Sequence, residues 1–183
     1  MLGQRMVSLV LDTNCIIELE EQRSDATTLS RIINAWREGR IDLAVVAISA
    51  SENQRGLLNE TYDQFLKKIE AVGLGGASQL LPPLFFDVTF WDASVFADDD
   101  GGLDEKLRDV LFPGMVLEAP KEERELRKWR NNLCDIYVAW SCIYHKWGTL
   151  VTRDENYHKK SEALAGLGLK VLWPAEAAEL CMP

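Results

Sequence analysis

The hydrophobic positions along the chain predict short buried strands that alternate with helices. Two runs, Met6–Leu11 and Ile41–Ile48, are apolar at almost every residue, which is typical of parallel strands covered on both faces. Shorter apolar runs predict further strands at Thr149–Thr152 and Leu169–Trp173, and Leu84–Phe90 is a candidate edge strand. Most stretches between these runs carry apolar residues at helical spacing.

The clearest helical pattern lies within Lys121–Trp147, as one long helix or two in succession, where apolar residues three and four apart form a stripe from Leu133 to Trp147. The other predicted helices are Cys15–Leu19, Leu29–Trp36, Ser49 to about Lys68, Leu103–Leu111, Glu155–Leu164 and a short one from Pro174. Either Thr13 or Asn14 is expected to cap the first of them. Since strands alternate with helices without hairpin signals, we predict an α/β fold with three layers, α/β/α, around a mostly parallel sheet of about four to five strands.

The length and composition fit one folded domain. The chain has 183 residues, of which 47% are hydrophobic, so that residues 1–183 are expected to form a single domain with its own core. The pattern loosens between residues 73 and 120, where glycines, prolines and a run of three aspartates from Asp98 indicate loops and short elements. This middle third is the least regular part of the sequence.

Two features predict a cytoplasmic protein that does not enter a membrane. No stretch approaches the ~18–20 apolar residues that a membrane helix needs, and the apolar start, Met6–Leu11, is too short for a signal peptide. The four cysteines are irregularly spaced, as expected for reduced thiols. Cys142 and His145 would share a helix face, but His158 is the only other histidine, and this ligand set is too sparse for structural zinc.

The net charge limits the modes of nucleic-acid binding that are open to this chain. It has 29 Asp and Glu against 20 Lys and Arg, a formal net charge of −9, which excludes a broadly cationic surface for nucleic acid. A local basic strip beside a metal-binding acidic cluster remains compatible with this charge.

Four acidic residues are expected at one edge of the predicted sheet. Asp12, Glu52 and Asp154 each follow a predicted strand, and the ends of parallel strands are where ligands gather in α/β folds. Asp135 lies on the long helix, roughly 110° from the centre of its apolar stripe, on a face shared with small residues. That helix can therefore turn Asp135 towards the strand ends.

Clustered carboxylates favour a divalent cation. Each raises the pKa of its neighbours, and a bound cation removes that penalty. Oxygen ligands without a set of His and Cys favour Mg²⁺ or Mn²⁺ over zinc. Such ions lower the pKa of bound water and contact phosphate oxygens. The four acids thus predict phosphodiester hydrolysis.

The same residues resemble the motifs of the PIN domain. The four matching segments are Leu9–Asn14, Ala47–Glu52, Leu133–Asp135 and Thr149–Asp154. The family orders its acids as an early Asp in a D-T-N or D-T-S motif, a Glu after the second strand, an Asp on a helix and an Asp in a T-x-D motif. The resemblance covers about residues 6–60 and 125–180, and residues 73–120 form an insertion that is atypical of the family.

This resemblance implies a PIN-like endoribonuclease, in which Mg²⁺ or Mn²⁺ is held by acids and a metal-bound water attacks RNA. The implied catalytic and metal-binding residues are Asp12, Glu52, Asp135 and Asp154. The residues implied to orient ligands or water are Asn14, Thr152 and, more weakly, Asn156. Many members are VapC-type toxins neutralised by an antitoxin, and many form homodimers. The implied partners are therefore RNA, an antitoxin or other protein, and a second copy of the chain.

Each acid also has a structural explanation. Asp12 and Asp154 fit turns that cap helices, and Glu52 fits a capping box with Ser49. Asp135 fits a first-turn charge if Asn131 or Asn132 caps the helix. The alternative function is accordingly a catalytically inactive PIN-like module that binds RNA or protein. A nuclease for structured DNA is a third alternative, because residues 73–120 could supply a helical arch.

A basic strip precedes Asp135. The basic residues Lys121, Arg124, Arg127, Lys128 and Arg130 stand among glutamates. They form either a salt-bridged solvent face or a strip that contacts phosphates, in which Arg127, Lys128 and Arg130 would bind RNA. With a net charge of −9, we expect weak, metal-bridged contact with RNA.

Overall fold

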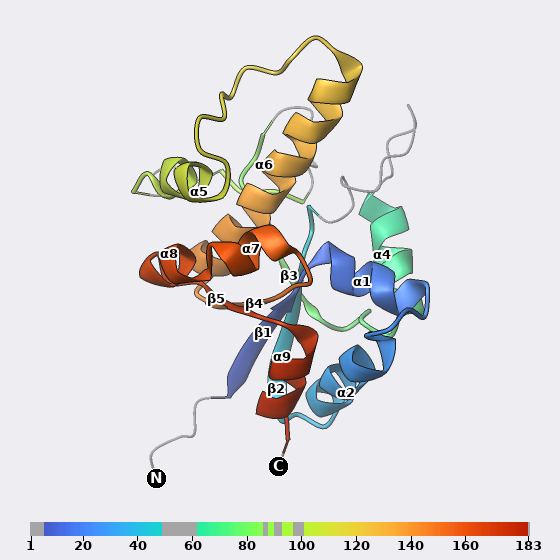
Figure 1. The fold of residues 1–183 in the computed structure, drawn as a ribbon. Helices are drawn as coiled ribbons and strands as arrows, with labels where there is room; N and C mark the ends of the chain where they lie inside the picture. Colours follow the sequence, from blue (N-terminus) through green and yellow to red (C-terminus); the bar gives the residue numbers. More distant parts are fainter. Residues whose placement is uncertain (1–5, 49–61, 86–87, 90–92, 97–100, 183) are drawn as a thin grey trace.

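The computed structural model describes residues 6–48, 62–85, 88–89, 93–96 and 101–182 (Figure 1). Its five strands are β1 (Val7–Leu11), β2 (Ile41–Val46), β3 (Ser78–Leu80), β4 (Thr149–Val151) and β5 (Lys170–Leu172). They form one sheet in the order β3-β2-β1-β4-β5, and every pairing is parallel. The sheet lies between two layers of helices, so the predicted three-layer α/β/α fold is confirmed.

The register places the end of β1 at the centre of one sheet edge. Leu11 pairs with Val45 of β2 on one side and with Val151 of β4 on the other. Because all strands are parallel, their carboxyl ends share this edge, where ligands of α/β folds bind. Asp12 follows Leu11 directly and therefore lies in the middle of the edge.

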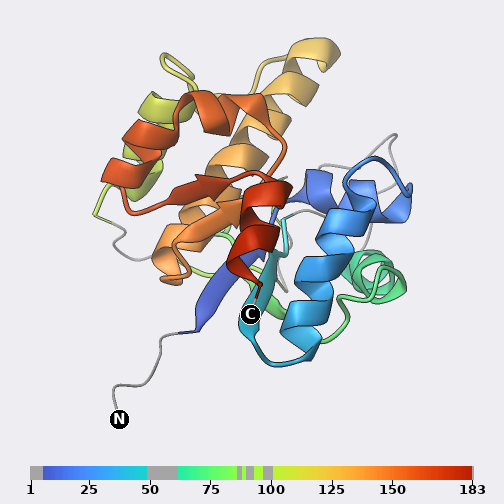
Figure 2. The ribbon, with the colours of Figure 1, turned by 60° about the horizontal axis from the view of Figure 1, so that its bottom comes forward.

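Alternate residues of the central strands lie in two hydrophobic cores, one on each face of the sheet. Val10 and Ala44 face one core, whereas Leu9 and Leu43 face the other, as the two-residue period of a strand requires. The helices of the first core are α5 (Leu103–Leu111), α6 (Glu123–Tyr144), α7 (Glu155–Lys159) and α8 (Ser161–Gly166). The helices of the second core are α1 (Thr13–Glu20), α2 (Ala26–Arg37), α4 (Tyr62–Ala71) and α9 (Pro174–Leu180). Figure 2 shows α2 and α9 side by side on the second face.

The predicted edge strand at Leu84–Phe90 is wrong for the residues that the structure describes. The edge strand is β3, whose Leu80 pairs with Val46 of β2. Beyond it the described chain makes only a single bridge, between Pro83 and Val95. Pro82 and Pro83 lack the backbone N–H that a continued ladder requires, which explains why the pairing stops before Leu84.

Two helix predictions are refined. The stretch Lys121–Trp147 holds one continuous helix, α6, and not two. The predicted helix Glu155–Leu164 is instead divided into α7 and α8 at Lys160. In the part of residues 73–120 that the structure describes, Leu107 and Leu111 pack into the same core as α6.

Among the described residues, no helix has the length and apolar character needed to cross a membrane.

Candidate functional site

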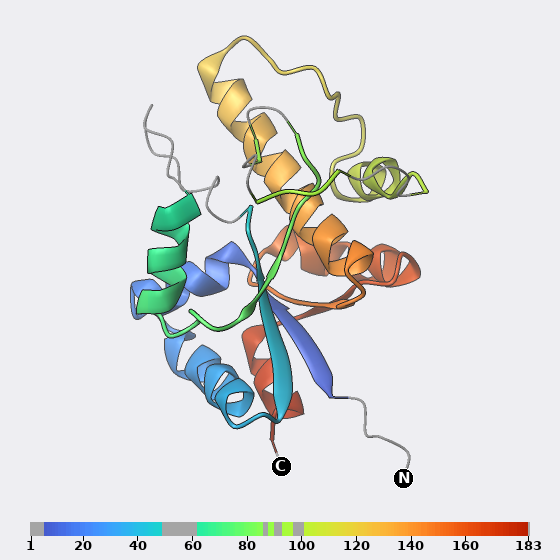
Figure 3. The same ribbon diagram turned by 180° about the vertical axis from the view of Figure 1, so that it is seen from behind.

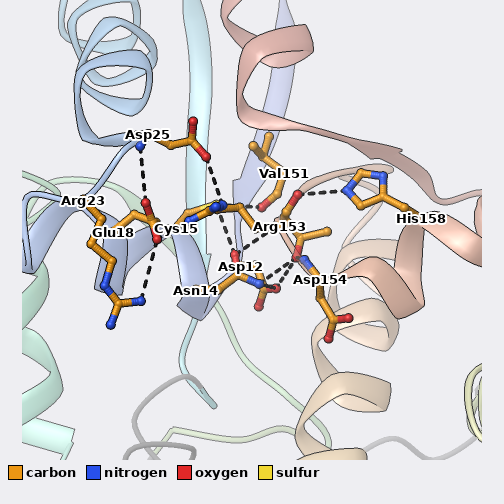
Figure 4. A network of polar contacts seen from close by, with 11 residues as sticks. Asp12, Asn14, Cys15, Glu18, Arg23, Asp25, Val151, Arg153, Asp154 and His158 are labelled. Atoms are coloured by element: carbon orange, nitrogen blue, oxygen red, sulfur yellow. Dashed lines mark hydrogen bonds and ion pairs between the residues drawn. The ribbon is translucent and has the colours of Figure 1, made fainter.

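Asp12 is a buried carboxylate held by three hydrogen bonds at the sheet edge (Figure 4). Its Oδ1 accepts a 2.7 Å bond from the backbone N of Thr13. Its Oδ2 accepts bonds of 2.7 Å from Nδ2 of Asn14 and 2.5 Å from Oγ1 of Thr152. Only 4% of Asp12 is exposed.

Asp12 is also the N-cap of α1, so the prediction that Thr13 or Asn14 caps this helix is wrong. The extended backbone of Asp12 is what places it at the cap.

Asn14 and Thr152 connect the ends of β1 and β4. Nδ2 of Asn14 donates to Oγ1 of Thr152 at 2.9 Å, and Oδ1 of Asn14 accepts from the backbone N of Arg153 at 3.1 Å. Oγ1 of Thr152 also accepts from the backbone N of Asp154 at 3.0 Å. Two of the three residues that were predicted to orient ligands, Asn14 and Thr152, therefore contact Asp12 directly, and Thr152 also bonds the backbone at Asp154, where the next helix begins.

Asp154 caps α7 through one of its two carboxylate oxygens. Its Oδ1 accepts from the backbone N of Asn156 at 2.7 Å. Within the described residues, Oδ2 of Asp154 has no hydrogen-bond or ion-pair partner. Asn156 contacts Asp154 through its backbone, whereas its side-chain Nδ2 donates to the carbonyl of Leu111 at 3.3 Å. Oδ2 of Asp154 is thus available to bind a ligand.

The pKa of Asp12 is raised from 3.8 to about 6. The main cause is burial, which disfavours the charged form, and the negative charge of Asp154 adds to it. The hydrogen bonds from Thr152, Thr13 and Asn14 act in the opposite direction without compensating for burial. Two carboxylates thus repel each other at a buried edge, which is the situation that a bound cation relieves.

Asp135 lies on the helix that borders this edge. Asp135 lies in the middle of the 22-residue helix α6. It is therefore not in the first turn of a helix, as it would be if Asn131 or Asn132 were the N-cap. Its backbone carbonyl accepts a 2.5 Å bond from the hydroxyl of Tyr157 in α7. Further along the same helix, the pKa of Cys142 is raised by burial and also by the charge of Asp12. Ala139 and Cys142, which share the face of Asp135, are fully buried in the core that also contains Val10 of β1, so this face of α6 packs towards the strand that carries Asp12 at its end.

The predicted group of four acids is placed in part. Asp12 and Asp154 interact electrostatically, and Asp135 lies on the adjoining helix. Glu52, with its capping box, lies outside the described residues. Among the described residues, no three His, Cys, Asp or Glu side chains are grouped closely enough to hold a metal ion. The oxygen ligands of Asp12 and Asp154, and their mutual repulsion, nevertheless fit Mg²⁺ or Mn²⁺, which keep water molecules in their coordination shell.

A buried ion-pair network supports the site and was not predicted. Glu18, only 2% exposed, pairs with Nη1 of Arg153. Nε of Arg153 pairs with Oδ2 of Asp25 at 2.9 Å, and Arg23 lies 3.7 Å from Glu18 (Figure 4). Arg153 stands between Thr152 and Asp154, so this network holds the turn that carries both. The available signal was a single acid, Glu18, inside the apolar run of α1.

The three basic residues predicted to bind RNA differ in their surroundings. Arg127 pairs with Glu123 at 3.6 Å on an exposed surface. Arg130 is partly buried, and its Nε has no hydrogen-bond partner in the described part of the chain. Lys128 is exposed.

A comparison of the chain with protein-family models, with curated proteins and with solved structures finds no match.

Proposed function

We propose that this protein is a PIN-like endoribonuclease that hydrolyses RNA phosphodiester bonds with Mg²⁺ or Mn²⁺ at the Asp12 edge. The observation that carries the proposal is the buried Asp12 carboxylate, whose pKa is raised to about 6 by burial and by Asp154. Strongly perturbed carboxylates at the carboxyl edge of a parallel sheet are candidates for functional sites. The resemblance of the acidic motifs to the PIN domain supplies the substrate class.

The side chains at this edge of the sheet would have different roles. Asp12 and Asp154 would hold the cation, with Asp135 contributing directly or through water. When bound there, a divalent cation supplies a Lewis acid that lowers the pKa of water and offsets charge on the phosphate. Asn14 and Thr152 hold the Asp12 carboxylate in one orientation through bonds of 2.7 and 2.5 Å. Glu52 is proposed as a further ligand on the motif resemblance alone.

Cleavage assays with Asp-to-Asn variants test the proposal. Wild-type protein is incubated with mixed RNA and with single-stranded DNA, each with Mn²⁺, Mg²⁺ or EDTA. We expect cleavage of RNA with either metal and none with EDTA. Asp12→Asn and Asp154→Asn should each reduce the rate by at least about 100-fold, because the negative charge that binds the cation is lost. Asn caps helices about as well as Asp does, so each variant keeps its helix cap. The Asp12 variant loses one of the two acceptor oxygens that Thr13, Asn14 and Thr152 contact.

Asp42→Asn is the matched control. Asp42 is an exposed acid near the start of β2, at the opposite edge of the sheet, and its variant should cleave RNA as the wild type does. Absence of metal-dependent cleavage by folded wild-type protein would refute the proposal. Full cleavage by Asp12→Asn and Asp154→Asn would refute the assignment of the site.

A PIN-like module without catalysis is the alternative, and one observation favours it. Asp12 and Asp154 both serve as N-caps with side-chain hydrogen bonds, so each has a structural role that needs no metal. On this alternative the protein binds RNA or another protein and does not cleave. RNA binding in EDTA together with absent cleavage in Mn²⁺ would distinguish it from the endoribonuclease.

A toxin role, with an antitoxin or a second copy as partner, is a further part of the proposal. It rests on the motif resemblance, as does action in the cytoplasm. Expression of the wild type in a bacterial host should arrest growth, and expression of Asp12→Asn should not. Equal growth with both proteins, at equal expression levels, would contradict the toxin role.

A further inference from the structure

One face of α6 connects the candidate site with the exposed end of that helix. Arg124, Lys128, Asn131 and Asp135 follow each other at intervals of four, three and four residues. At 100° per residue they lie within about 60° of one another around the helix axis. Asp135 belongs to the face turned towards the strand ends, so the other three continue that face outward from the site.

The exposed part of this face projects beyond the sheet. Figures 1 and 3 show the N-terminal half of α6 extending past the ends of the strands. Arg124, Lys128 and Asn131 are exposed, whereas Asp135 is partly buried. A rise of 1.5 Å per residue gives about 16 Å between Arg124 and Asp135, a length that several nucleotides of a single strand can follow.

The two cations on this face lack partners in the part of the protein that the structure describes. Among these residues, neither Arg124 nor Lys128 has a hydrogen bond or an ion pair. Arg127, in contrast, is paired with Glu123. Two like charges four residues apart weakly destabilise a helix, and Glu125, three residues before Lys128, offsets part of this repulsion. An external anion that binds both residues would remove this repulsion.

We infer that Arg124 and Lys128, with Asn131, form a track that binds the phosphates of single-stranded RNA and leads it to Asp135 and the strand ends. This inference rests on the proposed function, because that function makes RNA the polyanion that reaches the site. A single line of cations follows one backbone, which favours single-stranded over double-stranded RNA. Of the basic residues that the sequence predicted, the track keeps Arg124 and Lys128 and leaves out Arg127 and Arg130.

The test measures RNA binding in EDTA, where no cleavage occurs. A short labelled oligouridylate is titrated with wild-type protein at several salt concentrations, and the dissociation constant is obtained from fluorescence anisotropy. The double variant Arg124→Ala with Lys128→Ala should weaken binding by about tenfold at low salt. It should also reduce the slope of log Kd against log salt by about 1.4, since two phosphate contacts to a single strand are lost.

A second double variant controls for net charge. Arg127→Ala with Lys170→Ala removes the same two positive charges, one from a residue of α6 that is already paired with Glu123 and one from the first residue of β5. It should keep the wild-type affinity and salt slope. All four residues are exposed, and circular dichroism checks that both variants fold. Arg124→Lys with Lys128 intact retains both charges and should keep most of the affinity.

Three results would overturn the track. They are an unchanged salt slope in the Arg124 and Lys128 variant, an equal loss in the control variant, or equal binding of an oligoglutamate peptide through the same two residues. The last result would assign the face to an acidic protein. If the wild type binds RNA through the track but never cleaves it with Mn²⁺, the proposed function fails and the track stands. Cleavage by the wild type, with unchanged RNA binding in the Arg124 and Lys128 variant, refutes the track and leaves the proposed function in place.

Discussion

Asp12 combines two roles whose physical requirements conflict. As the cap of α1 and the acceptor of bonds from Asn14 and Thr152 it must be buried and fixed. As a carboxylate beside Asp154 it is penalised for carrying charge there, and its pKa rises to about 6. An ordinary cap is partly solvated and has no such penalty. This conflict makes Asp12 a candidate functional residue at the scale of single side chains.

The raised pKa of Asp12 predicts a loss of stability with rising pH. Between about pH 3.8 and 6 the folded protein keeps a proton that the unfolded chain releases. The free energy of unfolding should therefore fall as the pH rises through this window, by up to about 3 kcal/mol for this group. Denaturant unfolding in EDTA, compared between wild type and Asp12→Asn, isolates the contribution. A difference between the two proteins that stays constant from about pH 3.5 to 7 would contradict the prediction.

The ion pair between Arg153 and Glu18 predicts a large mutational effect. Arg153→Ala leaves the buried Glu18 with Arg23, at 3.7 Å, as its remaining cation among the described residues, beside a 3.3 Å bond from the backbone N of Asp25. We expect a loss of about 2 to 3 kcal/mol, somewhat below the cost for a fully buried pair, because 37% of the Arg153 side chain is exposed. Lys159→Ala, which breaks the exposed pair with Glu155, should leave the urea midpoint unchanged. Equal midpoints for Arg153→Ala and wild type would contradict the account.

At the scale of elements, the contact between α6 and α7 sets the position of Asp135. Tyr157 is buried, and its hydroxyl donates to the backbone carbonyl of Asp135. Asp154, at the start of α7, and Asp135, in the middle of α6, are thereby held in a defined relation. The site therefore depends on the packing of these two helices as well as on the strand ends.

Removing the Tyr157 hydroxyl tests this dependence. Tyr157→Phe should lower the free energy of unfolding by about 1 kcal/mol, the usual contribution of one hydrogen bond. It should also reduce RNA cleavage without changing oligouridylate binding in EDTA, because Arg124 and Lys128 are unaffected. A variant with normal cleavage would show that the spacing of α6 and α7 has no role in the site.

The elements near the site were predictable because their patterns are local. Val7–Leu11 and Ile41–Val46 are largely apolar on both faces, as covered parallel strands require. The stripe of α6 repeats over several turns, so its existence could be predicted, although its continuity could not. The edge strand was misplaced because the three-residue strand β3 carries too few residues for a pattern, whereas Leu84–Phe90 is largely apolar without forming a strand in its described residues.

The contacts within the candidate site were less predictable than the places of its residues. Asp12 and Asp154 could be placed at the edge because both follow predicted strands, whereas Asp135 was expected from its place on the long helix. The bonds that Thr152 makes with Asn14 and Asp12 join residues far apart in the sequence, and no local pattern encodes them. The Glu18 network and the direction of Arg124 and Lys128 depend likewise on how α1 and α6 pack.

At the scale of the whole molecule, a net charge of −9 has two consequences. It opposes general binding of polyanions, so on the proposed function RNA binding would depend on the local cations Arg124 and Lys128 and on a bound divalent ion. It also makes the acidic edge a favourable place for that ion. Both contributions weaken as salt screens the charges.

A divalent cation should stabilise the molecule in a manner that depends on pH. Metal binds only the ionised carboxylates, so Mn²⁺ should raise the melting temperature clearly at about pH 7.5 and little at about pH 5, where the Asp12 pKa of about 6 keeps most of it protonated. Binding at about 100 times the Kd corresponds to about 2.7 kcal/mol. The shift should vanish in Asp12→Asn with Asp154→Asn and persist in Asp42→Asn. Equal shifts in all three proteins would place the ion elsewhere.

The most direct test of the central claim is to locate Mn²⁺ by its anomalous scattering in crystals grown with the ion at neutral pH. The proposed function predicts a peak at about 2.1 Å from a carboxylate oxygen of both Asp12 and Asp154. A fully occupied Mn²⁺ more than about 3 Å from every oxygen of Asp12, Asp135 and Asp154, or no peak at this edge, would contradict it.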